Sequence, residues 1–353
     1  MKILLLGASF LAPGFRELGH NVVTCNTDGT GNIKIHEFPA SIQSVLRQLP
    51  FGWNPDCILL TDDSTYPMFW GLEEVDFPLG WFAIDSHIHH GWHRAYAAIF
   101  DFIFVAQPDY VSIYECDRER QMVKWLPLST FPLPETGSPL PKLYDLSFVG
   151  NVNARFNPER RVFLEAIQAR YPIHIATGEF VSIFTRSKMV LNQCICNDVN
   201  FRTFEVMACG SLLLMERVGN GLEELFQDGI HLVLYEKGNV DQVIEMAKYY
   251  SQYDQERETI ALAGQKEVLD QHTYTHRAQT ILNDLLAGDM NRKVQQRKAK
   301  IEEILYLITR VYEYVSALYD SHTGLVSQDS VQFRKLSVIR DKFKSFSTTL
   351  MRA

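Results

Sequence analysis

Short apolar runs recur along most of this chain, and each is followed by a polar or helical stretch. Apolar runs without polar alternation indicate strands that are buried on both faces, and helices between them indicate a parallel sheet with both faces covered. The pattern therefore predicts an α/β fold with a doubly wound sheet. The first series of runs comprises Lys2–Leu6, Asn21–Cys25, Asp56–Thr61, Gly80–Ile84, Asp101–Ala106 and Val123–Leu126.

A proline-rich stretch, Leu128–Leu143, interrupts this pattern, which then restarts. Such composition is typical of an extended linker. Two strand-and-helix arrays joined by one linker predict two Rossmann-like domains with a cleft at the carboxyl ends of their strands. The predicted parts are residues 1–130 for the first domain, 131–144 for the linker, 145–289 for the second domain and 290–353 for a basic helical extension. The second series of runs comprises Asp145–Val149, Ile173–Ala176, Met189–Cys194, Ser211–Met215 and His231–Tyr235.

The composition excludes several classes of protein. A length of 353 residues suits two domains, and 46% apolar with 22% charged residues is ordinary for a globular protein. The first apolar run is far too short for a membrane span or a signal peptide. The six cysteines show no CxxC spacing and mostly lie in apolar runs, which favours reduced thiols in the cytoplasm. No GxGxxG and no GxxxxGK[ST] occurs, which argues against NAD, FAD and P-loop nucleotides.

The C-terminal segment differs from the rest of the chain in charge and in pattern. Residues 291–353 hold 12 Lys/Arg against 6 Asp/Glu, in a chain with a net charge of −8. Apolar residues three and four apart predict a helical hairpin with an apolar seam, docked on the body or on a second copy. The charge fits a membrane surface, an anionic acceptor, a partner or simply a solvated helical face. The seam residues are Ile301, Ile304, Ile308, Val311, Val315 and Leu318, then Phe333, Leu336, Ile339, Phe343, Phe346 and Leu350.

Arg202 and Glu205 lie three apart near the start of a predicted helix, Arg202–Cys209, and therefore share one face. A carboxylate can accept both hydroxyls of a ribose, and an arginine can neutralise a diphosphate. This pair therefore suits a nucleotide-sugar site. The alternative is a surface salt bridge between the two side chains.

A Gly219-Asn220-Gly221 turn follows one strand later and opens a second predicted helix, Leu222–Gln227. Free N–H groups and partial positive charge at a helix start favour a diphosphate. The alternative is a merely flexible turn, and Glu223 and Glu224 in the first turn compete with the phosphate interpretation.

Three further positions could complete such a site. Gly150 and Asn151 follow the strand Asp145–Val149 and could approach the phosphates, and Gly178 follows Ile173–Ala176, where a base could pass the backbone. Lys188, just before the strand Met189–Cys194, could neutralise diphosphate or could be a solvated lysine.

The first domain carries a histidine-rich segment after the strand Gly80–Ile84. It begins Asp85-Ser86-His87-Ile88-His89, and Asp85, His87 or His89 could be the general base that deprotonates an acceptor hydroxyl. The alternatives are a metal site and a polar loop with one buried histidine.

Five motifs of the second domain occur together and in a familiar order. With them, residues 145 to 285 resemble the CgeB-like, spore-maturation-type glycosyltransferases, which belong to the group 1 enzymes of the GT-B fold. The motifs are DLSFVGN (Asp145–Asn151), SKMVLN (Ser187–Asn192), FRTFEVMACGSLLL (Phe201–Leu214), ELFQDG (Glu224–Gly229) and HTYTHR (His272–Arg277).

The resemblance implies sugar transfer from a nucleoside-diphosphate donor without a tightly bound metal. It implies that the second domain binds the donor and the first binds the acceptor. One position departs from the family: many retaining group 1 enzymes have a glutamate eight positions before the one matched by Glu205, where this chain has Asn197. Asp198 is adjacent and could substitute for it. Retention is thus weakly supported, and an inverting route through Asp85, His87 or His89 stays open.

We therefore expect a cytoplasmic GT-B hexosyltransferase, at most peripheral to the inner face of the membrane, that acts on a glycan, lipid or protein acceptor. We expect no cofactor, no metal and no nucleic-acid partner. The alternatives are a nucleotide-sugar epimerase of the same fold and a catalytically silent scaffold that acts through its C-terminal helices. The predicted donor-site residues are Gly150, Asn151, Gly178, Lys188, Asn192, Asp198, Arg202, Glu205, Gly219, Asn220 and Gly221.

Overall fold

The computed structural model describes residues 1–133, 140–152, 157–323 and 331–350. They fall into two compact units: unit 1 is Met1–Leu126 with Ala278–Ala353, and unit 2 is Pro127–Arg277. Residues 278–353 thus belong to the first unit, whereas the sequence prediction divided them between the second domain and a separate extension. The middle of the predicted linker, 134–139, and residues 324–330 of the predicted hairpin turn lie outside the described residues.

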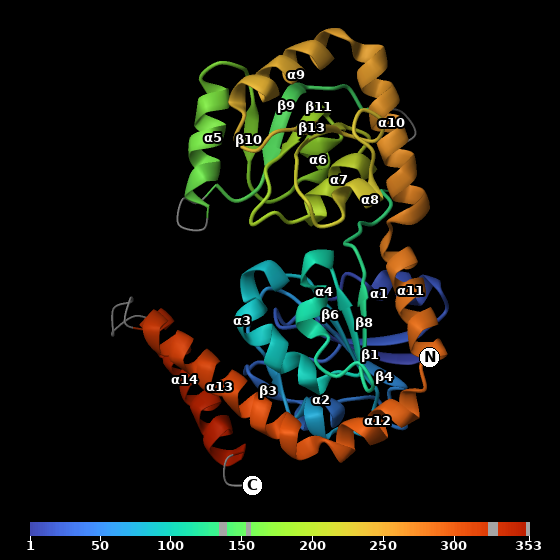
Figure 1. Cartoon of the computed structure of the whole chain (residues 1–353), viewed down its shortest axis with the longest axis vertical. Helices are drawn as coiled ribbons and strands as arrows, with labels where there is room; N and C mark the ends of the chain where they lie inside the picture. Colours follow the sequence, from blue (N-terminus) through green and yellow to red (C-terminus); the bar gives the residue numbers. More distant parts are fainter. Residues whose placement is uncertain (134–139, 153–156, 324–330, 351–353) are drawn as a thin grey trace. The chain divides into compact units, whose positions relative to one another are not determined.

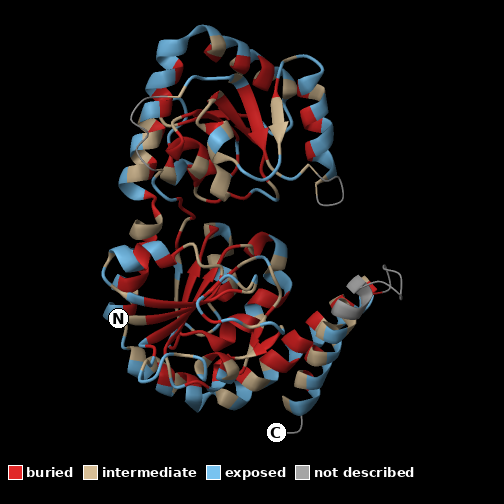
Figure 2. Ribbon diagram, turned by 180° about the vertical axis from the view of Figure 1, so that it is seen from behind, coloured by how far each residue is buried: buried red, intermediate tan, exposed pale blue. Residues whose placement is uncertain are grey.

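Unit 1 contains a six-stranded parallel sheet in the order β2-β1-β4-β6-β7-β8. Its central strands are continuous apolar runs, and Figure 2 shows them as buried. Burial on both faces follows because helices cover each side of the sheet. The strands are β1 (Lys2–Gly7), β2 (Asn21–Cys25), β4 (Cys57–Thr61), β6 (Leu79–Ala83), β7 (Phe102–Val105) and β8 (Met122–Trp125), and a small parallel pair adds β3 (Ala40–Ser41) and β5 (Phe69–Trp70).

Short helices connect these strands, and longer ones return to unit 1 from the C-terminal part of the chain (Figure 1). The connecting helices are α1 (Ala12–Glu17), α2 (Ile42–Leu46), α3 (Ser86–Tyr96) and α4 (Val111–Tyr114), with 3-10 turns at Leu72–Glu74, Ala97–Ile99 and Pro108–Tyr110. The C-terminal helices are α11 (Tyr274–Ala287), α12 (Met290–Ala299), α13 (Ile301–Thr323) and α14 (Val331–Leu350). The boundary between the two units falls within α11.

Unit 2 contains a five-stranded parallel sheet in the order β10-β9-β11-β12-β13. The chain order and the spatial order differ in the way that a doubly wound sheet requires. The strands are β9 (Tyr144–Val149), β10 (His174–Ala176), β11 (Ser187–Asn192), β12 (Leu212–Glu216) and β13 (Val233–Tyr235). The helices are α5 (Pro158–Gln168), α6 (Val181–Phe184), α7 (Phe201–Ala208), α8 (Leu222–Leu225), α9 (Val240–Gln252) and α10 (Asp254–Gln271).

The apolar seam of α13 is part of the core of unit 1. Ile304, Ile308 and Val315 are buried in the same cluster as Trp81 and Tyr96 of the sheet and its helices. Helix α14 packs along α13, and α13 also contacts α3 (Figure 1). Periodic apolar residues at three- and four-residue spacing thus bury one face of α13 against the body, as an amphipathic helix requires.

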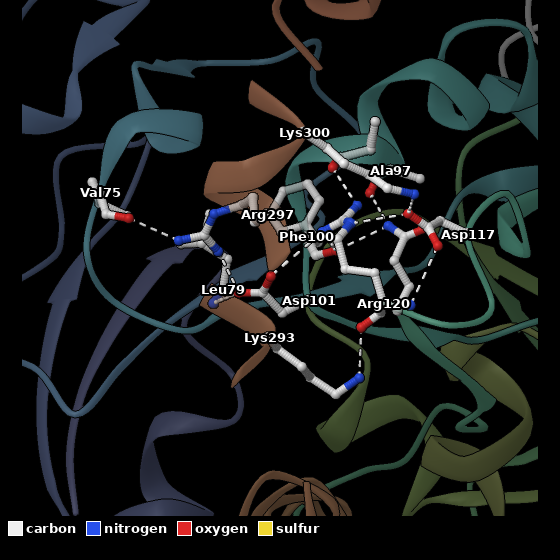
Figure 3. Close-up of polar contacts among 12 residues, drawn as sticks. Val75, Leu79, Ala97, Phe100, Asp101, Asp117, Arg120, Lys293, Arg297 and Lys300 are labelled. Carbon is white, nitrogen blue, oxygen red and sulfur yellow. Dashed lines mark hydrogen bonds and ion pairs between the residues drawn. The ribbon is translucent and has the colours of Figure 1, made fainter. Parts of the chain in front are cut away.

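A buried ion cluster holds α12 on the same unit (Figure 3). The Asp101 carboxylate pairs with the guanidinium of Arg297 and, at 3.4 Å, with that of Arg120. Arg297 also donates to the carbonyls of Val75 and Phe77, each at 2.8 Å. All three charged side chains are almost fully buried, so their pairing is needed to offset the cost of desolvation.

Two more basic residues, one in α12 and one directly after it, pair with acidic residues of unit 1. Lys298 pairs with Asp76, and Lys300 pairs with Asp117 at 2.6 Å. The positive charge of this segment is therefore partly matched within the unit. A membrane surface or a second copy as its partner stays a prediction. No helix among the described residues combines the length and the apolar character of a membrane span.

Candidate functional site

The carboxyl ends of β9, β10 and β11 surround a pocket of about 350 Å³ in unit 2. Side chains from the first turns of α5 and α7 complete its walls. A crevice beyond the carboxyl ends of parallel strands is where ligands bind in folds of this kind. The pocket is lined by Val149, Gly150, Asn151, Arg160, Thr177, Gly178, Phe180, Phe184, Ile195, Asp198, Asn200, Phe201, Arg202 and Glu205. Six of these residues were predicted for the donor site: Gly150, Asn151, Gly178, Asp198, Arg202 and Glu205.

Arg202 lies in the first turn of α7 and is held in one orientation. Its Nε donates to the Val149 carbonyl and its Nη1 donates to the Asn192 side chain, each at 2.8 Å. The guanidinium lies 4.7 Å from the centre of the Phe148 ring. Burial lowers its pKa to about 10, so the side chain stays a cation at neutral pH. A fixed cation on the pocket wall is suited to an anionic ligand.

Gly150 allows this placement of Arg202. A Cβ added at position 150 would collide with the guanidinium, so a larger residue would displace it. Gly178 follows the adjacent strand with a φ of +97°, a conformation that favours glycine, and has open space beside it. The two glycines thus leave the pocket wall as bare backbone, through which a flat group could approach.

Glu205 lies one turn after Arg202 on the same face of α7, as their spacing predicts. The side chain is half-buried, and burial raises its pKa to about 7 against the opposing effect of Arg202. Among the described residues none donates a hydrogen bond to this carboxylate. Both oxygens are therefore available to hydroxyl groups of a ligand.

Arg160 is a second cation of the pocket, and the sequence analysis missed it. Its Nε and Nη2 donate to the side chain and the carbonyl of Gln193 at 2.7 and 2.8 Å, and its Nη1 donates to the Asn151 carbonyl at 3.0 Å. Its guanidinium lies 5.5 Å from the centre of the same Phe148 ring that Arg202 covers. The sequence signal that could have found it was its place in the first turn of α5, two residues after Pro158 at the helix start.

Asp198 lies near both arginines and is 7% exposed. Its Oδ1 accepts the Ile195 N–H at 2.9 Å, which closes the loop between β11 and α7. Burial raises its pKa to about 6, and the Ile195 N–H and the two guanidiniums oppose that rise. The Asp198 carboxylate therefore fixes the loop through the Ile195 N–H and balances the positive charge of the two arginines.

Asn192 is fully buried and lies behind the pocket. Its Oδ1 accepts from Arg202, and its Nδ2 donates to Asn200 at 3.0 Å and to Thr203 at 3.1 Å. This residue therefore positions Arg202 and the start of α7. It does not line the pocket.

The Gly219-Asn220-Gly221 turn is fastened to the loop that carries Asn197. The Gly219 N–H donates to the Asn197 side chain at 3.0 Å, and the Asn220 side chain donates to the Asn197 carbonyl at 2.7 Å. Asn197, Asn220 and Gly221 all have positive φ, so both halves of this contact are tight turns. The helix that follows, α8, has only four residues, fewer than predicted, and its start offers little dipole for a phosphate.

Lys188 is not brought together with the other predicted donor-site residues. It lies at the amino end of β11, the opposite edge of the sheet, and pairs with Asp145 at 2.8 Å. Strand β11 begins two residues earlier than the apolar pattern predicts. Lys188 is thus within the strand, and an acidic neighbour on β9 matches its charge.

The predicted bases of the first domain lie at the carboxyl edge of the sheet in unit 1, around the start of α3. Asp85 precedes α3, and its N–H donates to the Asp62 carboxylate at 3.0 Å. His87 is buried, and burial lowers its pKa to about 4. His89 is half-buried, and its pKa is lowered by burial although the nearby Asp62 carboxylate opposes this.

Metal binding was an alternative for this histidine cluster. In the part of the chain that the structure describes, no three His, Cys, Asp or Glu side chains lie close enough together to hold a metal ion.

Part of the chain matches a known protein family. Residues 138–283 match the model of a family described as glycosyl transferase-like, a segment that includes the whole pocket of unit 2. No curated protein matches the chain in sequence. Several solved structures match over most of the chain.

Three of these structures have nearly equal scores. A glycosyltransferase from Rickettsia africae ESF-5 has a TM-score of 0.55 at 10% identity, covering 83% of this chain and 98% of that one. HepE from Anabaena, in complex with UDP and glucose, has a TM-score of 0.56 at 12% identity, and the match covers 82% of this chain and 100% of that one. Sucrose-phosphate synthase from Thermosynechococcus elongatus has a TM-score of 0.56 at 11% identity, and the match covers 81% of this chain and 99% of that one.

At these identities the likeness establishes the fold. The chain has the GT-B fold, with a Rossmann-like sheet in each unit. Together with the family match, the fold supports a group 1 glycosyltransferase.

Proposed function

We propose that this protein is a CgeB-like hexosyltransferase that transfers a sugar from a nucleoside-diphosphate donor to a glycan, lipid or protein acceptor without a metal ion. One observation carries the proposal. The pocket that joins Glu205 to two fixed arginines lies within the segment that matches the glycosyl transferase-like family. Six cysteines without disulfides also suit a reducing compartment, and we propose the cytoplasm.

The pocket supplies the groups that departure of a nucleoside diphosphate requires. The Glu205 carboxylate can accept the ribose hydroxyls, and Arg202 and Arg160 can take up the negative charge that develops on the leaving diphosphate. Positive charge fixed in place before the reaction stabilises that charge without reorganisation. This is the role that a divalent cation would otherwise have, so two arginines support a metal-independent reaction.

For the acceptor we retain Asp85, His87 and His89 as candidate bases of an inverting reaction. Of these, His89 is the best placed, because it is half-buried beside the Asp62 carboxylate. A neighbouring carboxylate orients an imidazole and stabilises its protonated form. His87 is a weaker base, because burial lowers its pKa to about 4.

The nucleotide is identified by a thermal-shift series with UDP-, GDP-, ADP- and dTDP-sugars. A ligand that binds only the folded protein stabilises it by about 2.7 kcal/mol at a hundredfold excess over its Kd. The complex of the structurally similar HepE with UDP makes UDP-glucose the first donor to try. The absence of a shift with all four donors would contradict the proposal.

Glu205→Ala and Arg202→Ala test the site itself. Each removes a charged hydrogen-bonding partner of the donor, so each is expected to reduce turnover about tenfold to hundredfold while the protein stays folded. Glu165→Ala is the matched control, because Glu165 is an exposed glutamate of α5 that pairs with Arg161 and does not line the pocket. Parental rates of donor hydrolysis and transfer in both variants would show that the donor binds elsewhere.

A further inference from the structure

A small recess in unit 1 lies at the carboxyl ends of β1 and β4, beneath α3. Its volume is about 20 Å³, and a cavity of about 10–15 Å³ holds one water-sized group. The recess therefore has room for a single hydroxyl. Gly7 lets the first strand end close to this point, because a Cβ there would collide with the Thr61 carbonyl.

Three buried polar groups of residues that line the recess have no hydrogen-bond partner within the described part of the chain. They are Oγ1 of Thr61, which is 0% exposed, Nε1 of Trp92, which is 5% exposed, and the hydroxyl of Tyr96, which is 1% exposed. A buried polar group without a partner costs about 1–3 kcal/mol. An indole only donates, whereas a hydroxyl both donates and accepts. A ligand hydroxyl in the recess could accept from Trp92 and exchange hydrogen bonds with the other two groups.

The same opening carries two fixed carboxylates. Asp63 accepts from the hydroxyls of Thr27 and Thr65. Asp62 accepts the N–H groups of Ser64, Ile84 and Asp85 at 2.9 to 3.1 Å. Both residues line the recess. Carboxylates held in this way attract hydroxyl donors.

An aromatic wall completes the surroundings. The Tyr66 ring lies 5.8 Å from that of His89, the favoured candidate base, and 5.4 Å from that of Tyr319 in α13. Helix α13 thus supports Tyr66, which lines the recess and also contacts His89. Polar hydrogen-bonding groups beside an aromatic ring suit a polyhydroxy ligand, and a recess of about 20 Å³ has no room for an acyl chain.

We propose that this recess binds one hydroxyl of a saccharide, and that the acceptor is therefore a carbohydrate. The identification of that saccharide as the acceptor rests on the proposed function, whereas its binding to the recess does not. Thr61, Trp92 and Tyr96 are the residues that hold the hydroxyl. Tyr319 is a positioning residue that acts through Tyr66.

The indole N–H of Trp92 provides a direct test. The protein has five tryptophans, and Nε1 of Trp53 and of Trp125 already donates to Asn21 and to Ala106. In a protein labelled with ¹⁵N at tryptophan, we add glucose, galactose, mannose, N-acetylglucosamine and maltose, each at high concentration. At least one sugar is expected to shift the Trp92 indole signal, assigned with Trp92→Phe, while the Trp53 and Trp125 signals stay in place. If no sugar shifts it, or if all indoles shift alike, the recess holds only structural water and the proposal is wrong.

Conservative variants give an independent measurement. Thr61→Val and Tyr96→Phe each remove one hydroxyl, which is expected to raise the Kd of the active sugar about fivefold. Tyr250→Phe is the control, because Tyr250 is a buried tyrosine of unit 2 that does not line the recess. An unchanged Kd in both recess variants, with an unchanged melting temperature, would overturn the proposal.

UDP binding distinguishes this proposal from the proposed function. Loss of sugar binding with UDP binding intact in Thr61→Val supports the recess. Sugar binding by a protein that binds no nucleotide would leave the recess valid and would refute the transferase.

Discussion

Glu205 meets two requirements that oppose each other. To bind ribose it must be ionised, but its half-buried position favours the neutral form, and its pKa is raised to about 7 from 4.5. Arg202 offsets only part of this cost. A destabilising charge at a binding residue is expected where function and stability compete.

The pH dependence of stability follows from this pKa. The pKa of Glu205 is higher in the folded protein than in the unfolded chain. Its contribution to the free energy of unfolding is therefore fully present below pH 4.5 and is lost as the pH rises through about 7. Glu205→Gln removes this loss. We expect the variant to match the parent near pH 4.5 and to exceed it by about 1–2 kcal/mol at pH 8, in urea unfolding. A stability difference that does not change with pH would contradict the burial of the charged form.

The two pocket arginines show where residue-level prediction stopped. Glu205 and Arg202 were found because they lie three apart on one helix. Arg160 comes from a different helix and joins Arg202 only across the Phe148 ring, a contact between residues far apart in sequence. Lys188 was expected near the diphosphate, but it lies at the amino end of β11, whereas the pocket lies at the carboxyl ends of the strands. Strand ends are poorly marked by apolar patterns.

At the scale of elements, α12 shows how a basic segment can be part of a fold. Its four basic residues and lack of acidic ones suggest a solvated helix, but Arg297 is fully buried against Asp101. Burial raises the pKa of Asp101, and Arg297 and Arg120 oppose that rise. The buried Asp101 carboxylate is therefore stable as an anion only while Arg297 and Arg120 remain beside it.

Arg297→Met tests this contact. It leaves a buried carboxylate with Arg120 as its remaining guanidinium partner, which is expected to cost about 3–5 kcal/mol in the free energy of unfolding. Lys298→Ala is the control, because that lysine pairs with Asp76 on the surface and is expected to change stability by about 0.5 kcal/mol or less. Equal effects of the two substitutions in urea unfolding would show that the buried cluster does not hold α12.

At the scale of the whole molecule, the chain forms two separate cores. One cluster joins the first sheet to α13 and α14, and the other surrounds the second sheet. Each unit contains enough buried apolar surface for its own cooperative transition. The proposed donor pocket lies entirely in unit 2, and the recess proposed to bind a saccharide lies entirely in unit 1.

Calorimetry of the intact protein should therefore show two transitions. We expect UDP to raise only the transition of unit 2, because a ligand stabilises the unit that binds it. Arg297→Met should lower only the transition of unit 1, which identifies the two peaks. A single transition that both changes shift together would mean that the two cores unfold as one.

The local sequence was sufficient to predict the strands of the two main sheets, most helices and the doubly wound class, because burial on both faces and helical periodicity are properties of consecutive residues. It did not predict the short pair β3 and β5. It also located Glu205 and Arg202, since their spacing alone puts them on one helix face. Tertiary structure decided which unit residues 278–353 join, that Arg160 lines the donor pocket, and that Asn197 fastens the glycine turn. Each of these depends on contacts between residues that are distant along the chain, and their energies are determined by burial and by charge pairing that no single segment contains.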